Sequence, residues 1–372
     1  MRHTAVQLSK LKGRSLSEVY GRSRQHLTML WDRLLGSMRG EMTDGEMLEE
    51  LVLIPESSRW QSVSVDEVLP GAVEAMRKRL INAPAIPAMA DRARIRAVMD
   101  ERWPKERAAL IRAADRAAHL QFDIFGLADL DFGAPINWRR EPVSGKETAL
   151  DHWSQIDYLN SAISGDKKVT WELNRHAHFV VLAQAYCLTG NETYAEAFVK
   201  QASSWMDQNP PEMGINWTSS LEVAVRSIAW IWALHLCVES RHLSAPFLAR
   251  VFKYLISHAN HIESYLSTYF SPNTHLTGEA LGLFYLGTCF PEFRRAETWK
   301  EKGLKTLVEQ LPIQVNADGI YFEQSSYYHR YSVDFYLHLL ILGRGAGVSL
   351  PKEIERRLEA MTDYLVWITR PD

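Results

Sequence analysis

Cysteine is scarce in this sequence, with 3 residues in 372. Cys187, Cys237 and Cys289 all lie within apolar stretches, so we expect buried thiols rather than a disulfide framework. No C-x-x-C or H-E-x-x-H motif is present, and His258 and His261, three residues apart, have no evident third ligand. The sequence therefore predicts neither a metal site nor a cofactor.

An excess of charge of one sign is also lacking. Lys and Arg total 42 and Asp and Glu total 45, which gives a net charge of −3 and argues against a nucleic-acid partner. No uncharged apolar run reaches the length of a membrane span, so none is expected. Residues 1–14 are basic without an apolar run behind them, which predicts no signal peptide and leaves the cellular location open.

Tryptophan and histidine, by contrast, are plentiful, with 12 and 13 residues. From about residue 150 the apolar residues recur at helical spacing, and glycine, proline and capping residues divide the chain into successive helices. Helix pairs that recur about every 40 residues, without sequence self-similarity, favour an all-α toroid of antiparallel pairs over a regular solenoid. The expected helices span residues 169–188, 191–209, 217–238, 244–270, 274–286, 294–311, 325–342 and 351–368.

The N-terminal part has a different pattern. We expect residues 1–85 to form a helical extension, with an amphipathic helix at 11–35 and a polar, irregular stretch at 39–65. Residues 86–372 are expected to form the toroid, which begins with a long charged helix at 90–120. The Gly-, Pro- and Asp-rich stretch 123–153 predicts a long functional or covering loop.

Two polar groups interrupt the apolar helices. Glu172 and His176 are four residues apart, as are Glu222 and Arg226, so each pair is expected to share a helix face, with Arg175 beside the first pair. Structural ion pairs produce the same pattern, although a charged pair in apolar surroundings needs partners to offset its desolvation. The aromatic and amide neighbours of these pairs are Trp171, Asn216 and Trp217.

Two further groups lie near the ends of later helices. Asn273 is positioned to cap the helix at 274–286, whose N-terminus favours an anion, and His275 and Glu279 share a face one turn inside. Residues 319–331 hold four Tyr beside proton-transfer and charged groups, although an aromatic cluster that packs helix ends has the same composition. The polar members singled out in this stretch are Glu323, Tyr328, His329 and Arg330.

In order and spacing, the runs 171–176, 216–226, 273–279 and 323–329 resemble the N-terminal helical domain of heparinase II/III-like polysaccharide lyases. The resemblance covers roughly residues 85–372, and the segment 151–153 with its preceding loop is similar to bacterial members. It implies an incomplete (α/α) toroid followed by a C-terminal β-sandwich domain, and it makes a periplasmic location possible. This agrees with the toroid predicted from helical periodicity.

The resemblance also implies β-elimination in an acidic, uronic-acid-containing polysaccharide, such as a glycosaminoglycan or an exopolysaccharide. In this reaction the sugar carboxylate must be hydrogen-bonded so that a base can remove the C5 proton, and an acid must protonate the leaving O4. Asn273 is implied to contact the carboxylate and Tyr328 to protonate O4, with His275 and His329 as further catalytic groups. The residues expected to bind substrate are Trp171, Glu172, Arg175, His176, Asn216, Trp217, Glu222, Arg226, Glu323 and Arg330.

Tyr328 is a poor base at its ordinary pKa near 10, so a second role as base requires a nearby cation, for which Arg175, Arg226 and Arg330 are the candidates. The adjacent Tyr327 leaves the assignment ambiguous by one residue, and the position before His329 favours Tyr328.

Two observations keep other functions open. Family members carry a further catalytic His on the β-sandwich domain, whereas this chain ends at residue 372, so that domain is expected in a longer protein. A glycoside hydrolase on the same toroid needs two carboxylates across one cleft, about 5 Å or about 6.5–9.5 Å apart, for which Glu222 and Glu323 are the candidates. A non-catalytic glycan-binding protein of an exopolysaccharide pathway is the third possibility.

Overall fold

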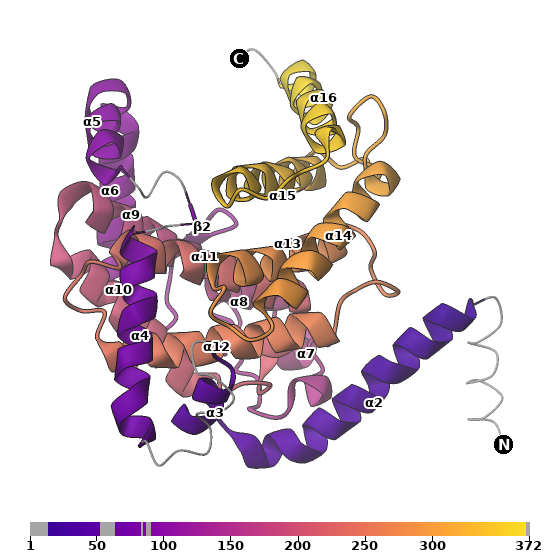
Figure 1. Ribbon diagram of the computed structural model, residues 1–372, viewed down its shortest axis with the longest axis horizontal. Coiled ribbons are helices and arrows are strands. Elements are labelled where there is room, and N and C mark those ends of the chain that lie inside the picture. Colours follow the sequence, from indigo (N-terminus) through magenta and orange to yellow (C-terminus); the bar gives the residue numbers. More distant parts are fainter. Residues whose placement is uncertain (1–13, 53–63, 83–84, 87–90, 370–372) are drawn as a thin grey trace.

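A computed structural model describes residues 14–52, 64–82, 85–86 and 91–369 (Figure 1). The expectations for residues 1–13, for 53–63 within the irregular stretch and for the chain end at 370–372 lie outside the described residues. The N-terminal helices are α2 (Leu16–Arg39), α3 (Asp44–Glu49), α4 (Val65–Asn82), α5 (Arg92–Arg102) and α6 (Pro104–Ala118).

The remaining elements are helical apart from one short hairpin, β1 (Phe122–Ile124) and β2 (Leu127–Leu130), which pair antiparallel. Short helices follow as η3 (Trp153–Gln155), α7 (Ser161–Ser164), α8 (Lys167–Asn174) and η4 (Ile215–Trp217). The long helices are α9 (Ala177–Thr189), α10 (Glu192–Gln208), α11 (Ser220–Cys237), α12 (Ala245–Ser264), α13 (Thr274–Cys289), α14 (Ala296–Gln314), α15 (Ser326–Gly345) and α16 (Lys352–Ile368).

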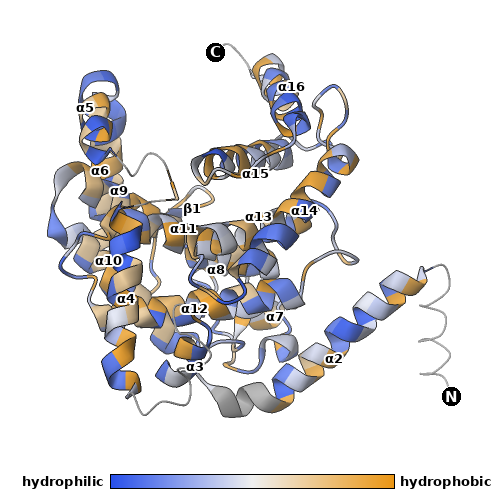
Figure 2. Cartoon of the chain, viewed as in Figure 1, coloured by the Kyte–Doolittle hydropathy of each residue, from blue (hydrophilic) through white to orange (hydrophobic). Residues whose placement is uncertain are grey.

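These helices form an incomplete (α/α) toroid. Helix α11 packs against α9 and α13, and α13 packs in turn against α15, while α10 contacts α9, α12 contacts α11 and α13, α14 contacts α13, and α16 contacts α15. In Figure 1 the α5–α6 end and the α15–α16 end of this arc stay apart. Figure 2 shows hydrophobic residues gathered in the central helices α9 and α11, which agrees with the many buried apolar residues of both. The predicted all-α toroid is therefore confirmed.

Local signals set several helix ends as predicted. Gly190 ends α9 with a φ of +70°, a conformation that glycine adopts without a steric penalty. Asn191 then caps α10, Ser244 caps α12 with Pro246 in its first turn, and Asn273 caps α13. The three cysteines are free and buried, as expected.

Three expected helices are interrupted. The 169–188 helix is broken by His176, which has a φ of +59° between α8 and α9, so Glu172 and His176 do not share a face. The 90–120 helix is divided before Pro104, because a residue that precedes proline is disfavoured in the helical region. Trp217 belongs to η4 rather than to α11, whose first residue is Ser220.

The N-terminal region is more helical than expected, since α3 lies within the stretch predicted to be irregular and α4 follows it. Helix α4 packs on α12, and α2 runs along one side of the molecule (Figure 1). A domain boundary at residue 85 stays a prediction. Helix α11 is long and apolar enough to cross a membrane by composition, but 83% of it is buried, and it carries Glu222 and Arg226.

Candidate active site

Arg175, at the C-terminal end of α8, joins three segments of the chain. Its guanidinium donates from Nε and Nη2 to the two carboxylate oxygens of Glu222, at 2.6 and 2.9 Å. Nη1 donates to Glu172 at 2.9 Å and to the Tyr331 hydroxyl at 2.7 Å. Burial opposes the charge of Arg175, but the two carboxylates outweigh it and raise the pKa of this residue. Glu222 and Arg226 do share a face of α11, as predicted, but the ion-pair partner of both Glu172 and Glu222 is Arg175, and the predicted pair Glu172–His176 is wrong.

Asn273 links the start of α13 to the segment before α15. Its side-chain oxygen accepts from the backbone N–H of His275 at 3.1 Å, which is the predicted N-cap. Its amide Nδ2 donates to Glu323 at 3.0 Å, and the Thr274 hydroxyl donates to the other oxygen of Glu323 at 3.2 Å. Asn273 and the 319–331 segment, far apart in sequence, thus meet as expected.

His275 lies between these two groups of polar contacts. Burial lowers the pKa of His275, an effect partly offset by the carboxylates of Glu222 and Glu323 and reinforced by Arg175. A histidine whose pKa is lowered is neutral at pH 7, so its imidazole can accept a proton. His275 also lines an open pocket, and among the predicted catalytic residues it is the one found in that lining.

Three tyrosines lie on the first turns of α15. Tyr328 follows the capping residue Ser325 and is 43% exposed, and Tyr327 is 49% exposed. The Tyr327 hydroxyl is 3.5 Å from that of Tyr331, which contacts Arg175. Burial raises the pKa of Tyr331, so contact with the cation does not make this phenol a base.

His329 does not take part in the cluster. Its Nδ1 accepts from the backbone N–H of Tyr321 at 3.4 Å, its Nε2 donates to the carbonyl of Met361 at 2.9 Å, and the side chain is 2% exposed. With both ring nitrogens bonded to the backbone, His329 holds the 319–321 turn against α16. This corrects the expectation that it is a catalytic group.

Four predicted substrate-binding residues lie below the surface, each at most 1% exposed: His176, Asn216, Trp217 and Arg226. Arg226 donates to the carbonyl of Asn216 at 3.0 Å, and burial lowers the pKa of Arg226 to about 9. The Nδ1 of His176 accepts from the indole N–H of Trp230 at 2.8 Å. We expected these four residues to contact a sugar, with Trp217 as a stacking surface. This expectation is corrected, because they lie beneath the surface and support the site. For the same reason, Arg226 is no longer a candidate for the cation that would lower the pKa of Tyr328.

The open pocket that His275 lines has a volume of about 570 Å³. It lies between α2, α8, the start of α11 and the segment from the end of α12 to the start of α13. Trp171 lines it as predicted, with its indole N–H donating to the carbonyl of Ile215 at 3.2 Å. Aromatic rings that line a polar pocket provide the flat apolar surfaces on which sugar rings stack, so this is the candidate substrate cleft.

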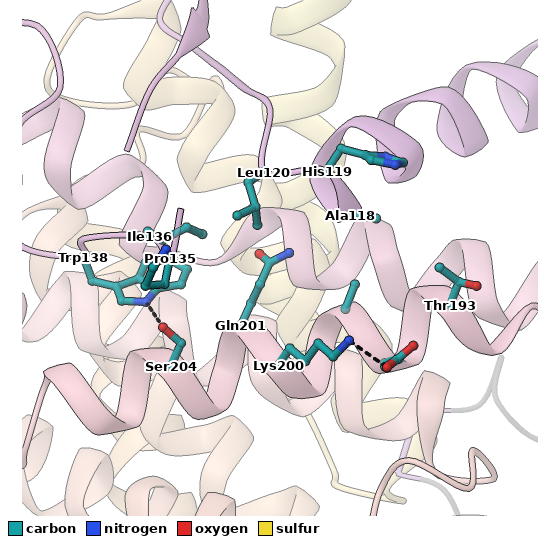
Figure 3. Close-up of a pocket in the computed structure, with 12 residues that line it drawn as sticks. Ala118, His119, Leu120, Pro135, Ile136, Trp138, Thr193, Lys200, Gln201 and Ser204 are labelled. Carbon is teal, nitrogen blue, oxygen red and sulfur yellow. Dashed lines mark hydrogen bonds and ion pairs between the residues drawn. The ribbon is translucent and has the colours of Figure 1, made fainter. Parts of the chain in front are cut away.

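Two other hollows differ in character. One of about 450 Å³ lies beside Glu172 and is lined by Arg112 and Arg116 of α6, so α8 is flanked on both sides. The other, of about 320 Å³, lies between α6, α10 and residues 135–138 (Figure 3). Its lining is mainly apolar, and it contains none of the predicted site residues.

The protein is thus an (α/α)-toroid protein. A polar cluster lies at the N-terminal ends of its central helices, beside an aromatic cleft. The family model described as the heparinase II/III N-terminus matches residues 93–372, and the chain belongs to this family.

Curated relatives include a heparin-sulfate lyase of Pedobacter heparinus, 30% identical over 271 residues, which covers 70% of this chain and 37% of the relative. A heparin-sulfate lyase of Bacteroides thetaiotaomicron is 28% identical over 54% of this chain and 29% of the relative. The crystal structure of a heparan sulfate lyase from Pedobacter heparinus superimposes with a TM-score of 0.61 at 22% identity, over 88% of this chain and 49% of that one. The chain thus spans about half, or less, of the proteins that it matches.

Sequence reasoning did not single out some residues of the site. Tyr331 was one of four tyrosines in a run, and its spacing gave no sign that it bonds Arg175, 156 residues away. Lys167 and Tyr158 line the cleft, but they lie just before the periodic helical region. A short run of two lysines, 167–168, ahead of Trp171 was the available signal for a ligand of negative charge.

Proposed function

We propose that the chain is the helical part of a polysaccharide lyase that cleaves a uronic-acid-containing glycan, of the glycosaminoglycan type, by β-elimination. The observation that carries this proposal is the arrangement of Asn273, His275 and Glu323 beside the aromatic cleft. The similarity to curated relatives that are heparin-sulfate lyases supports the same class of substrate.

Asn273 is proposed to contact the uronate carboxylate. Its Nδ2 carries two hydrogens, of which Glu323 accepts one, so the second is available to an oxygen of the sugar. The start of α13 adds backbone N–H groups and the positive end of the helix dipole at the same place. Both features stabilise the charge that builds up on the carboxylate as C5 loses its proton.

His275 and Tyr328 are proposed as the proton-transfer groups. The neutral imidazole of His275 takes the C5 proton, the C4–O4 bond breaks as the C4=C5 double bond forms, and Tyr328 gives its phenolic proton to O4. Two of the three candidate cations, Arg175 and Arg226, are bonded elsewhere, so we propose Tyr328 as the acid and His275 as the base. Arg330, which is exposed, stays a proposed substrate contact.

The salt bridge of Glu222 weighs against glycoside hydrolysis. A hydrolase needs two carboxylates that reach the glycosidic bond, whereas both oxygens of Glu222 accept from Arg175 and its side chain is 4% exposed. Glu323 is likewise bonded to Asn273 and Thr274. Neither is positioned as a free acid or nucleophile.

The test is to incubate the protein, in a form that includes the expected C-terminal domain, with heparan sulfate and to follow the ultraviolet absorbance of the unsaturated uronate product. Elimination produces this absorbance together with new reducing ends. New reducing ends without absorbance would establish hydrolysis, and binding without either product would establish a non-catalytic glycan-binding protein. A rate that falls as the pH is lowered through the pKa of His275 is expected if this residue is the base.

A further inference from the structure

Helix α2 lies outside the region that the family model matches, yet it forms one wall of the cleft. Gln25, His26 and Met29 of α2 line the pocket. The helix is fixed there because Gln25 donates to the carbonyl of Leu266 at 2.9 Å and Arg22 donates to the carbonyl of Tyr269. The hydroxyl of Tyr265 donates to Asp32 at 2.5 Å. The N-terminal extension is therefore built into the cleft.

The side of the cleft formed by α8 carries a cation on an aromatic surface. The ammonium of Lys167 lies 5.1 Å from the ring centroid of Tyr158 and 5.8 Å from that of Trp171. The two rings are 5.5 Å apart and tilted by 48°. Within the described part of the chain, no carboxylate lies within ion-pair distance of Lys167. Among the described residues, the ammonium thus has aromatic rings and no carboxylate beside it.

The rest of the cleft lining favours negative charge in a ligand. Among the described residues that line it, Glu279 alone is acidic. Both of its oxygens accept from Ser267, from the backbone N–H at 2.7 Å and from the hydroxyl at 2.6 Å. Burial raises the pKa of Glu279 to about 8, so this carboxyl is mostly neutral at pH 7. Lys168 and His26 add basic groups to the lining, whereas Arg22, which also lines the cleft, is paired with Glu18 at 2.8 Å.

We propose that Lys167, the Tyr158–Trp171 rings and helix α2 form a subsite that binds one anionic sugar unit. The apolar face of the sugar stacks on the rings, its carboxylate or sulfate contacts the ammonium, and His26 with Gln25 closes the subsite from the side of α2. This proposal rests on the proposed function in one respect, which is that the ligand is a uronic-acid-containing glycan. It makes the N-terminal extension a determinant of specificity.

The first experiment replaces the charge and keeps the stem. Lys167→Met retains the aliphatic chain on the two rings, so the fold and the stacking surface should be unchanged. The probes are a heparosan tetrasaccharide, which carries carboxylates alone, and an N-sulfated heparan sulfate tetrasaccharide, both measured by isothermal titration calorimetry. The dissociation constant should rise about tenfold, the equivalent of about 1.4 kcal/mol, and depend less on salt.

The two probes distinguish the source of the charge. A loss with both tetrasaccharides assigns the subsite to the uronate carboxylate, and a loss with the sulfated one alone assigns it to sulfate. The control is Lys305→Met on α14, an exposed lysine outside the cleft, which should leave both dissociation constants unchanged. Equal affinities for wild type and Lys167→Met would overturn the proposal, as would a wild-type protein that binds neither probe.

The second experiment tests the wall that α2 provides. His26→Glu places a negative charge inside the cleft, and Ser23→Glu makes the same change in charge on an exposed residue of α2 that does not line it. We expect His26→Glu to weaken binding several-fold and Ser23→Glu to have no effect. Equal effects of the two variants would remove α2 from the subsite.

Failure of the lyase proposal and failure of the subsite proposal give different experimental results. If wild type binds the probes, the variants weaken binding as expected and no unsaturated product forms, the subsite stands and the lyase proposal fails. If product forms and neither Lys167→Met nor His26→Glu changes the Michaelis constant or the dissociation constant, the lyase proposal stands and the subsite fails.

Discussion

Arg175 and Glu222 form a two-point salt bridge, with distances of 2.6 and 2.9 Å, across 47 residues of sequence. The remaining guanidinium nitrogen reaches Glu172 and the hydroxyl of Tyr331. A single side chain thus ties the end of α8 to the start of α11 and to α15, the helix that carries Tyr328. We propose that this salt bridge positions the three helices around the site.

Glu222→Gln should destabilise the protein strongly. The side chains of Arg175 and Glu222 are 17% and 4% exposed, and removal of one partner from a buried pair leaves the other charge poorly compensated. The expected loss is about 3 kcal/mol, because Glu172 still neutralises part of the charge on Arg175. Chemical denaturation would measure it. Glu359→Gln, which changes an exposed carboxylate on α16, is the control and should not shift the midpoint. Equal midpoints for the two variants would contradict the structural role.

Tyr328→Phe should lower turnover by about 10²- to 10⁴-fold, since it removes the proposed acid and nothing else. Tyr327→Phe is the matched control: it removes the adjacent phenol, of similar exposure, and should cost much less. Initial rates of formation of the unsaturated product on heparan sulfate would compare them. If Tyr327→Phe is instead the inactive variant, the acid is Tyr327, whose hydroxyl lies 3.5 Å from that of Tyr331.

Asn273 has two roles that substitution can separate. Asn273→Ala removes both the cap of α13 and the amide donor, so we expect a loss of about 1 kcal/mol in stability and of most turnover. Asn273→Ser retains an oxygen that can cap the helix but lacks the amide. It should therefore have near-normal stability in thermal denaturation and the same loss of turnover. Full activity of Asn273→Ser would show that Asn273 is a cap and not a substrate contact.

The helices and their caps were predictable because they depend on neighbours in sequence. Gly190, Asn191 and Ser244 act within a few residues of their own position, as does the N-cap Asn273. The break at His176 was not predictable from apolar spacing, because its left-handed backbone accompanies burial against Trp230, 54 residues away.

The same reasoning explains which site residues were misplaced. Sequence spacing pairs Glu222 with Arg226 four residues later, whereas the tertiary fold brings Arg175 to Glu222 and leaves Arg226 bonded to backbone carbonyls. Trp217 is buried because of the packing of η4, which the residues around it in sequence do not indicate. The residue types of a site can be read from sequence, but their depth depends on contacts between distant segments.

Glu279 should make stability depend on pH in a direction opposite to that of most carboxylates. Its pKa rises from an ordinary value of 4.5 to about 8 on folding, because burial penalises the charged form. Below pH 4.5 the folded and unfolded states both hold the proton. Between pH 4.5 and 8 only the folded state does, so this contribution to stability is lost as the pH rises.

Glu279→Gln removes this titration and keeps groups that can bond both the N–H and the hydroxyl of Ser267. At pH 5 the variant should match wild type in free energy of unfolding, and at pH 8.5 it should be more stable by on the order of 3 kcal/mol. Urea denaturation across this range measures the difference. The control Glu309→Gln, on the surface of α14, should follow the wild-type curve. Parallel curves for Glu279→Gln and wild type would mean that this carboxyl is ionised in the folded protein and adds a negative charge to the cleft.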